Sequence, residues 1–183
     1  MIDFNPTKIP DIIVIEPTVY SDERGFFLET YREAEFKAAG IQGKFVQDNH
    51  SGSVRGTLRG LHYQLKQPQA KLVQVVSGEI FDVAVDLRQS SPTFGDWVGE
   101  VLSSENKLQL WIPPGFAHGF YVLSEWANVI YKVTDYYAPQ WDRTLLWNDP
   151  EVGIDWPLIE GADLNISTKD AKGHRFRDAE IFS

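Results

Sequence analysis

Apolar and polar residues alternate along much of the chain, a pattern that predicts β-strands more than helices. In residues 79–87 (EIFDVAVDL), apolar side chains fall at every second position from Phe81 to Leu87, which is the period of a strand. Further strands are predicted at residues 11–17, 25–31, 58–64, 96–103, 107–113 and 127–135. Turn sequences separate them at residues 21–25, 90–96, 103–106 and 113–119. Short strands at this spacing predict a mainly β fold of the sandwich or barrel type.

Only one helix is clearly indicated. Residues 32–40 (REAEFKAAG) favour a short helix with Gly40 as its stop signal. Beyond Pro139 the sequence becomes irregular, so residues 139–183 are expected to form loops and short helices packed on the β-structure. No repeat, low-complexity segment or linker divides the chain, and 183 residues are enough for one full core. We therefore expect a single domain over residues 1–183.

Composition and charge narrow the function classes. The chain is 43% hydrophobic and 13% aromatic, which excludes a disordered protein. Its net charge of −9 argues against a nucleic-acid partner, and it has no cysteine for disulfides or thiolate chemistry. No apolar run is long enough for a bilayer, and no basic-then-apolar leader opens the chain. The sequence predicts a soluble, cytoplasmic protein with no membrane partner.

The first candidate chemistry is in the strand-like run LRGLHYQ, residues 58–64. It places Arg59 and His62 three residues apart. Strict alternation would direct these two side chains to opposite faces of the strand. A bulge or twist at Gly60, between them, could direct both to one face. The pattern leaves these two arrangements open.

Two spacings resemble the sequence motifs of the cupin superfamily of small jelly-roll barrels. The first contains His62, Gln64 and Lys71, and the second is the run PPGFAH, which ends at His118. In metal-binding cupins the first motif supplies two histidines and a glutamate, and the second supplies one more histidine. Here Gln64 replaces a histidine and Lys71 stands at the glutamate position. Because two imidazoles and a cation make a poor site for a divalent metal, we predict no metal.

The altered set suits proton transfer. His62 can act as a general base near neutral pH. Lys71 can stabilise an oxyanion as it develops. Tyr131 lies on the same face of its predicted strand as Val129 and Val133, so we expect it to point inward, where its phenol can return a proton to carbon. A base, an oxyanion stabiliser and a separate acid together suit epimerisation next to a carbonyl, which needs no cofactor.

At this point the resemblance becomes specific. The chain is similar to the dTDP-4-dehydrorhamnose 3,5-epimerase family in six strings, in order and spacing, between about Val14 and Lys172: DERGFFLETY, QDNHS, RGTLRGLHYQ, GEIFDVAVDLR, PPGFAHGF and WNDP. The resemblance implies a cupin-type jelly-roll barrel with a few short helices. It also implies epimerisation of a dTDP-4-keto-6-deoxy sugar at C3 and C5, through enolates and without a cofactor.

The resemblance further implies roles for matching residues. His62 would be the base and Tyr131 the acid, Lys71 would stabilise the enolate, and Asp170 would orient His62. Ser167 and Asp170 could also form a simple helix cap. Further substrate contacts would come from Arg24, Arg59 and Lys169, from Glu29, Gln47, Asp48, Asn49 and His118, and from the aromatic residues Phe26 and Tyr137 beside the nucleotide base. Asp142 replaces a glutamate of many relatives, and its shorter side chain could reach the substrate only through water.

The resemblance also implies a homodimer. In the family the N-terminal strand reaches across to the partner subunit, so residues 12–31 are expected to exchange between protomers. Arg24, Phe26 and Glu29 would then serve the neighbouring site. Three alternatives remain open on the sequence: an epimerase that acts at one carbon only or on another deoxysugar, a metal-free cupin that only binds a nucleotide sugar, and a metal-dependent cupin oxygenase.

Overall fold

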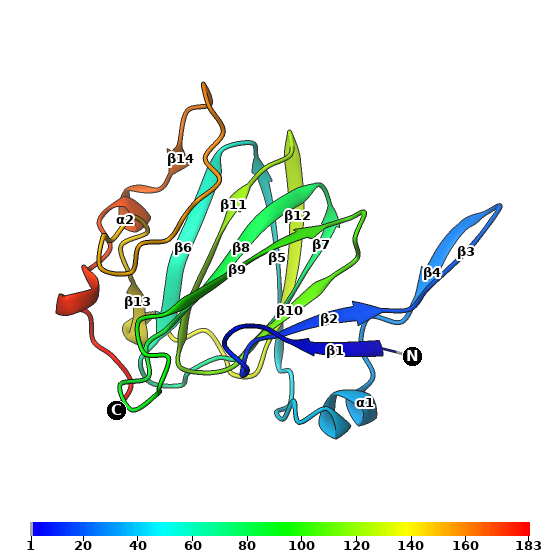
Figure 1. Cartoon of the computed structure of the whole chain (residues 1–183), viewed down its shortest axis with the longest axis horizontal. Coiled ribbons are helices and arrows are strands. Elements are labelled where there is room, and N and C mark those ends of the chain that lie inside the picture. The colour runs from blue at the N-terminus through cyan, green and yellow to red at the C-terminus, as the bar shows by residue number, and fades with distance from the viewer. Residues whose placement is uncertain (1) are drawn as a thin grey trace.

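The computed structural model describes residues 2–183 and shows two largely antiparallel β-sheets that face each other (Figure 1). The first sheet contains, in spatial order, β1 (Ile2–Pro6), β2 (Ile13–Pro17), β10 (Gln109–Ile112), β7 (Lys71–Ser77), β12 (Trp126–Val133) and β5 (Gln47–Val54). The second contains β13 (Asp142–Thr144), β6 (Thr57–Gln64), β11 (Phe116–Val122), β8 (Glu79–Asp86) and β9 (Trp97–Ser103). The short β14 (Asn165–Ile166) joins β6 in parallel. The mainly β fold predicted from the alternation is confirmed.

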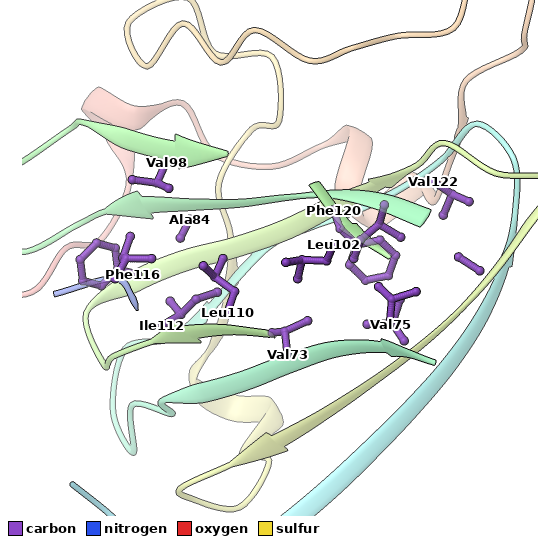
Figure 2. Packing of buried hydrophobic residues seen from close by; sticks show 14 of the residues in the cluster. Val73, Val75, Ala84, Val98, Leu102, Leu110, Ile112, Phe116, Phe120 and Val122 are labelled. Carbon is purple, nitrogen blue, oxygen red and sulfur yellow. The ribbon is translucent and has the colours of Figure 1, made fainter. Parts of the chain in front are cut away.

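Apolar side chains from the inner faces of the two sheets form a continuous core between them (Figure 2). Val73 and Val75 on β7 meet Ala84 on β8 and Phe120 on β11, and all four are buried. Full burial of a large apolar side chain contributes roughly 1.5–3 kcal/mol. Tyr131 packs against this core from a partly buried position, so the wall of the site described below continues the core.

Residues after Pro139 form only short elements that cover the second sheet. Besides β13 and β14 they comprise η1 (Pro139–Trp141), α2 (Thr168–Ala171) and η2 (Phe176–Asp178). Trp156 and other apolar residues of this segment pack with Leu58 and Val83 in a second core cluster. This packing places α2 beside β6, with Asp170 hydrogen-bonded to Gly60. None of the helices in residues 2–183 is long and apolar enough to cross a membrane.

Several elements differ from the sequence-based expectation. The predicted helix is present as α1 (Glu33–Ala38). The turn expected over residues 113–119, however, is confined to Pro114 and Gly115, and β11 begins at Phe116. Every position of β11 is buried, and a strand buried on both faces shows no alternation. The predicted strands also omit β5, because its sequence QDNHSGSV is mostly polar.

A two-stranded ribbon projects from the body of the protein (Figure 1). It consists of β3 (Val19–Asp22) and β4 (Gly25–Leu28), which pair only with each other. Its aromatic side chains are open to solvent, with Phe27 70% and Phe26 58% exposed. An isolated two-stranded ribbon is marginal in water. The ribbon therefore presents apolar surface that the rest of the chain leaves largely exposed.

An irregularity between β6 and β11 settles how Arg59 and His62 are directed. His118 pairs with His62, but Phe120 pairs with Arg59, so three steps on β6 correspond to two on β11. The extra residue on β6 is a bulge, which shifts the alternation by one position. Arg59 and His62 accordingly line one cavity. Of the two arrangements that the sequence left open, the structure has the one with a bulge between Arg59 and His62.

Replacing Gly60 with alanine is expected to lower the free energy of unfolding by at least about 2 kcal/mol. Gly60 has φ +115°, and a Cβ there would lie 2.5 Å from the Cα of Gly119. Urea unfolding of the variant measures the loss. Gly161→Ala is the matched control, because Gly161 also has positive φ but has nothing within 4 Å of the added carbon. Equal losses in the two variants would contradict the close-approach argument.

Candidate active site

Two adjoining cavities lie between the facing sheets. The larger, of about 320 Å³, is open to solvent, and the smaller has a volume of about 140 Å³. His62, Lys71 and Tyr131 line both cavities. His62 comes from β6 in the second sheet, whereas Lys71 and Tyr131 come from β7 and β12 in the first. The three side chains predicted to carry the chemistry are therefore brought together from opposite walls.

His62 is held by a buried carboxylate. Its Nε2 lies 2.7 Å from Oδ1 of Asp170, and the two side chains are 36% and 6% exposed. Burial alone would raise the pKa of Asp170, but hydrogen bonds from His62 and the Gly60 N–H, with the charge of His62, hold it below its usual value. Asp170 is therefore ionised and accepts the Nε2 proton, which leaves Nδ1 of His62 free to take a proton.

Asp170 is presented by α2, and the capping interaction considered from the sequence is also present. The Asp170 backbone N–H donates to Oγ of Ser167 at 3.1 Å. Ser167 thus fixes the first turn of the helix, while the Asp170 side chain remains available to His62. The helix cap and the contact with His62 are compatible. The cap uses the Asp170 backbone N–H, whereas the contact with His62 uses the Asp170 carboxylate.

Asp170→Asn is expected to lower kcat by about 10²-fold or more, because the imidazolium formed at His62 loses its counter-charge. Ser167→Ala is the control, since it removes the cap but leaves the carboxylate beside His62. A pH–rate profile identical to that of the unmodified protein would contradict the orienting role.

Lys71 is buried on the floor of the site. Its Nζ donates to the carbonyl oxygen of His62 at 3.3 Å and lies 3.4 Å from Nδ1 of His118. Burial lowers the pKa of Lys71 to about 8, although the charges of Asp82 and Asp142 oppose the shift. The ammonium is thus mostly protonated at neutral pH but poorly solvated. Such a cation is suited to stabilise a developing oxyanion.

Asp82 is a site residue that the sequence interpretation missed. It is fully buried on β8, and both carboxylate oxygens lie 2.9 Å from Nε2 of His118. Burial lowers the pKa of His118, so its neutral ring donates from Nε2 and presents Nδ1 toward Lys71. The negative charge of Asp82 also favours the protonated form of Lys71. The sequence offered one signal for this role: Asp82 is an acidic residue within the apolar strand predicted at residues 79–87.

Tyr131 keeps its proton at neutral pH. Burial raises the pKa of its phenol, and the charge of Arg59 only partly offsets this. Its neighbours Val129 and Val133 are buried, as expected for an inward-facing tyrosine on β12. Arg59 lies across the smaller cavity, where its Nε donates to Oγ of Ser53 at 3.0 Å. The phenol is therefore available as an acid beside a fixed cation.

The structure brings most of the remaining predicted residues to this site. The larger cavity is lined by Gln47, Asn49, Tyr137, Asp142 and Lys169, among others, and His118 lines the smaller one. Asp142 forms an ion pair with Lys169 and accepts a hydrogen bond from the Tyr137 hydroxyl at 3.2 Å. Its short side chain is thus engaged by two neighbouring residues at the wall. These contacts fix Tyr137 and Lys169 at the mouth of the cavity.

Four predicted residues are not brought to the site of their own chain. Arg24 and Phe26 lie on the projecting ribbon, where Arg24 pairs with Asp22. Glu29 follows the ribbon and pairs with Arg32. Asp48 is exposed and pairs with Lys132, because the alternation of β5 directs it away from Gln47 and Asn49. Asp48 is therefore not among the residues that line the larger cavity, and its contact with the substrate stays a prediction.

Gln64 performs a structural task at the position where metal-binding cupins carry a histidine. Its carbonyl accepts the Ala138 N–H at 2.8 Å, and its amide donates to the carbonyl oxygens of Gln67 and Tyr136. The side chain thus secures the loop that carries Tyr137. Among residues 2–183 no group of three or more His, Asp or Glu side chains could hold a metal ion. These side chains do not fit a divalent metal. The absence of a metal from the protein stays a prediction.

Comparison with known proteins identifies the family of this chain. A family model described as dTDP-4-dehydrorhamnose 3,5-epimerase matches residues 6–178. The enzyme of that name from Pseudomonas aeruginosa is 60% identical over 175 residues, which cover 95% of this chain and 96% of that protein. Substantial identity over the full length therefore extends well beyond the short strings that first suggested the resemblance.

Solved structures show the same fold. The 3,5-epimerase from Legionella pneumophila, in complex with dTDP-4-keto-L-rhamnose, is 52% identical, with a TM-score of 0.94 and coverage of 97% of this chain and 94% of that chain. A 3'-monoepimerase from Streptomyces bikiniensis, in complex with dTDP-quinovose, is 32% identical, with a TM-score of 0.87 and coverage of 94% and 87%. The cupin-like fold predicted from the sequence is confirmed. This chain belongs to the dTDP-4-dehydrorhamnose 3,5-epimerase family.

Proposed function

We propose that this protein, acting in the cytoplasm as a homodimer, epimerises dTDP-4-dehydro-6-deoxy-D-glucose at C3 and C5 to dTDP-4-dehydro-L-rhamnose. The observation that carries the proposal is the convergence of His62, Lys71 and Tyr131 on one cavity from facing sheets. A sugar bound between the sheets has a base on one side and an acid on the other. Removal of a proton from one face and its return to the opposite face inverts the carbon.

Each inversion proceeds through an enolate. Nδ1 of His62 takes the proton from the carbon next to the C4 ketone, and the C–H electron pair forms a C=C bond while the carbonyl oxygen becomes an oxyanion. Lys71, whose ammonium is itself buried, stabilises that charge. The Tyr131 phenol then donates a proton to carbon on the opposite face, and the C=O bond re-forms. Proton return from His62 to Tyr131 through solvent completes the cycle, and no electrons are gained or lost.

Identity with relatives favours action at two carbons. The relative of 60% identity is named as a 3,5-epimerase, whereas the solved monoepimerase is 32% identical. The deciding experiment is NMR of dTDP-4-keto-6-deoxyglucose incubated with the protein in D₂O. Deuterium at both C3 and C5 would establish the double epimerisation. Deuterium at one carbon would assign the protein to the single-epimerase class, and the absence of exchange would leave a protein that only binds nucleotide sugars.

The projecting ribbon supports the homodimer. It carries Arg24 and exposed Phe26 away from the cavity of its own chain, and its aromatic surface needs cover. A second copy would receive this ribbon beside its own cavity, with Arg24 at the diphosphate. The relatives' complexes with dTDP-sugars are compatible with such a cation, since arginine suits phosphate oxygens.

Mixing two inactive variants tests this exchange. Arg24→Ala and His62→Ala are each expected to be impaired, but a mixed dimer combines an intact His62 with the partner's intact Arg24. Equal mixing with subunit exchange should restore about a quarter of the unmodified activity, because half of the dimers regain one of two sites. A mixture no more active than its components, in which mass spectrometry detects the mixed dimer, would contradict the shared site.

A further inference from the structure

The hydroxyl of Ser51 on β5 is shielded from solvent, yet it has no hydrogen-bond partner among residues 2–183. Buried hydroxyls are nearly always paired, because an unpaired one loses its hydrogen bonds to water without replacement. Ser51 lines the smaller cavity together with Arg59, His62, Lys71 and Tyr131. Among residues 2–183 the hydroxyl therefore has no partner at the wall of this cavity, which leaves it available to a molecule bound there.

The alternation of β5 fixes the place of Ser51 along the site. Its side chain shares a face with Asn49 and Ser53, the residues two positions away on either side. Ser53 holds the Nε of Arg59 at 3.0 Å. In the other direction, Asn49 pairs directly with Tyr131 on β12. Ser51 consequently lies between the cation and the phenol.

The groups of the proposed substrate follow the same order. Its diphosphate is attached at C1, its reacting carbon C3 stands two bonds away, and C2 with a free hydroxyl lies between them. Arginine is the phosphate-binding group, and Tyr131 is the acid at the reacting carbon. We propose, on the basis of the function proposed above, that Ser51 hydrogen-bonds to the C2 hydroxyl. This bond holds C2 so that the neighbouring C3–H is directed at His62.

A cycle of enzyme and substrate changes tests the contact. Ser51→Ala is expected to lower kcat/KM about 10-fold with the parent 4-keto-6-deoxy substrate, the factor that one lost hydrogen bond produces. The 2-deoxy analogue should lose a similar factor with the unmodified enzyme. With both changes together no further loss is expected, because the same bond is removed once. The midpoint of thermal unfolding should not fall, since the hydroxyl has no partner among residues 2–183.

Two variants serve as controls. Ser51→Thr keeps the hydroxyl and should retain most of the activity. His50→Ala changes the adjacent residue, which is exposed on the opposite face of β5, and should leave kcat/KM unchanged. The proposal would be overturned if Ser51→Ala lowered kcat/KM by the same factor with the parent substrate and with the 2-deoxy analogue. It would also be overturned if Ser51→Ala did not lower kcat/KM with the parent substrate. An unmodified enzyme that fails to epimerise the parent substrate would instead overturn the proposed function, on which this contact rests.

Discussion

His62→Gln is expected to lower both kcat and the rate of deuterium uptake at C3 and C5 by about 10²–10⁴-fold, because the carboxamide cannot accept a proton from carbon. Glutamine resembles histidine in size and can still donate a hydrogen bond to Asp170, so the wall of the site should be retained. Binding of dTDP to the variant should remain close to that of the unmodified protein. NMR in D₂O and calorimetry with dTDP measure the two effects separately.

Tyr131→Phe provides a matched comparison. It leaves His62 and Lys71 in place but removes the proposed acid, so solvent exchange should continue while inversion is lost. Exchange in the His62→Gln variant at the rate of the unmodified enzyme would show that another group removes the proton. If deuterium exchange disappeared equally in His62→Gln and Tyr131→Phe, the assignment of His62 as the base and Tyr131 as the acid would be contradicted.

Lys71→Met is expected to lower kcat by about 10²–10³-fold and to make the protein more stable. The activity falls because the enolate loses a buried cation, and Arg59, the other cation around the smaller cavity, is exposed. The stability rises because an ammonium buried in this site is unfavourable. A pKa of about 8, against the usual 10.5, corresponds to about 3 kcal/mol of destabilisation. Lost hydrogen bonds reduce the net gain to about 1–3 kcal/mol.

The pH dependence follows from the direction of that shift. The folded protein disfavours protonated Lys71, so its penalty is complete below pH 8 and disappears as the pH rises from 8 to 10.5. The stability gain of Lys71→Met should therefore be largest below pH 8. Activity follows the opposite trend and should fall above about pH 8 as the ammonium loses its proton. Urea unfolding and kcat/KM, each measured from about pH 6 to 10, test both statements.

A second substitution at the same position separates charge from size. Lys71→Arg keeps a cation at all accessible pH values, so any activity it retains should not decline between about pH 8 and 10. Unchanged activity of Lys71→Met would contradict the catalytic role of the ammonium. Stability below that of the unmodified protein at about pH 7 would contradict the statement that its burial is unfavourable.

The sequence by itself determined the mainly β class and the position of α1, and it was sufficient to propose which side chains react. Alternation in residues 79–87 is a local property that depends on the period of the strand, so it could be recognised without tertiary contacts. His62, Lys71 and Tyr131 could be selected by the chemistry of their side chains, together with the family spacing. Asp170 could be matched in the same way, although it lies 108 residues from His62.

Tertiary structure decided which of these side chains meet and in what environment. The register shift between β6 and β11, which brings Arg59 and His62 to one cavity, depends on a partner strand and not on the local sequence. Asp48 is chemically similar to neighbours that line the cavity, but the pairing of β5 with β12 directs it outward. Burial lowers the pKa of Lys71, and the charge of buried Asp82 partly opposes that shift. Both effects require walls contributed by distant segments. The alternation along a chain specifies strands, whereas the electrostatics of a site depends on the strands that face one another.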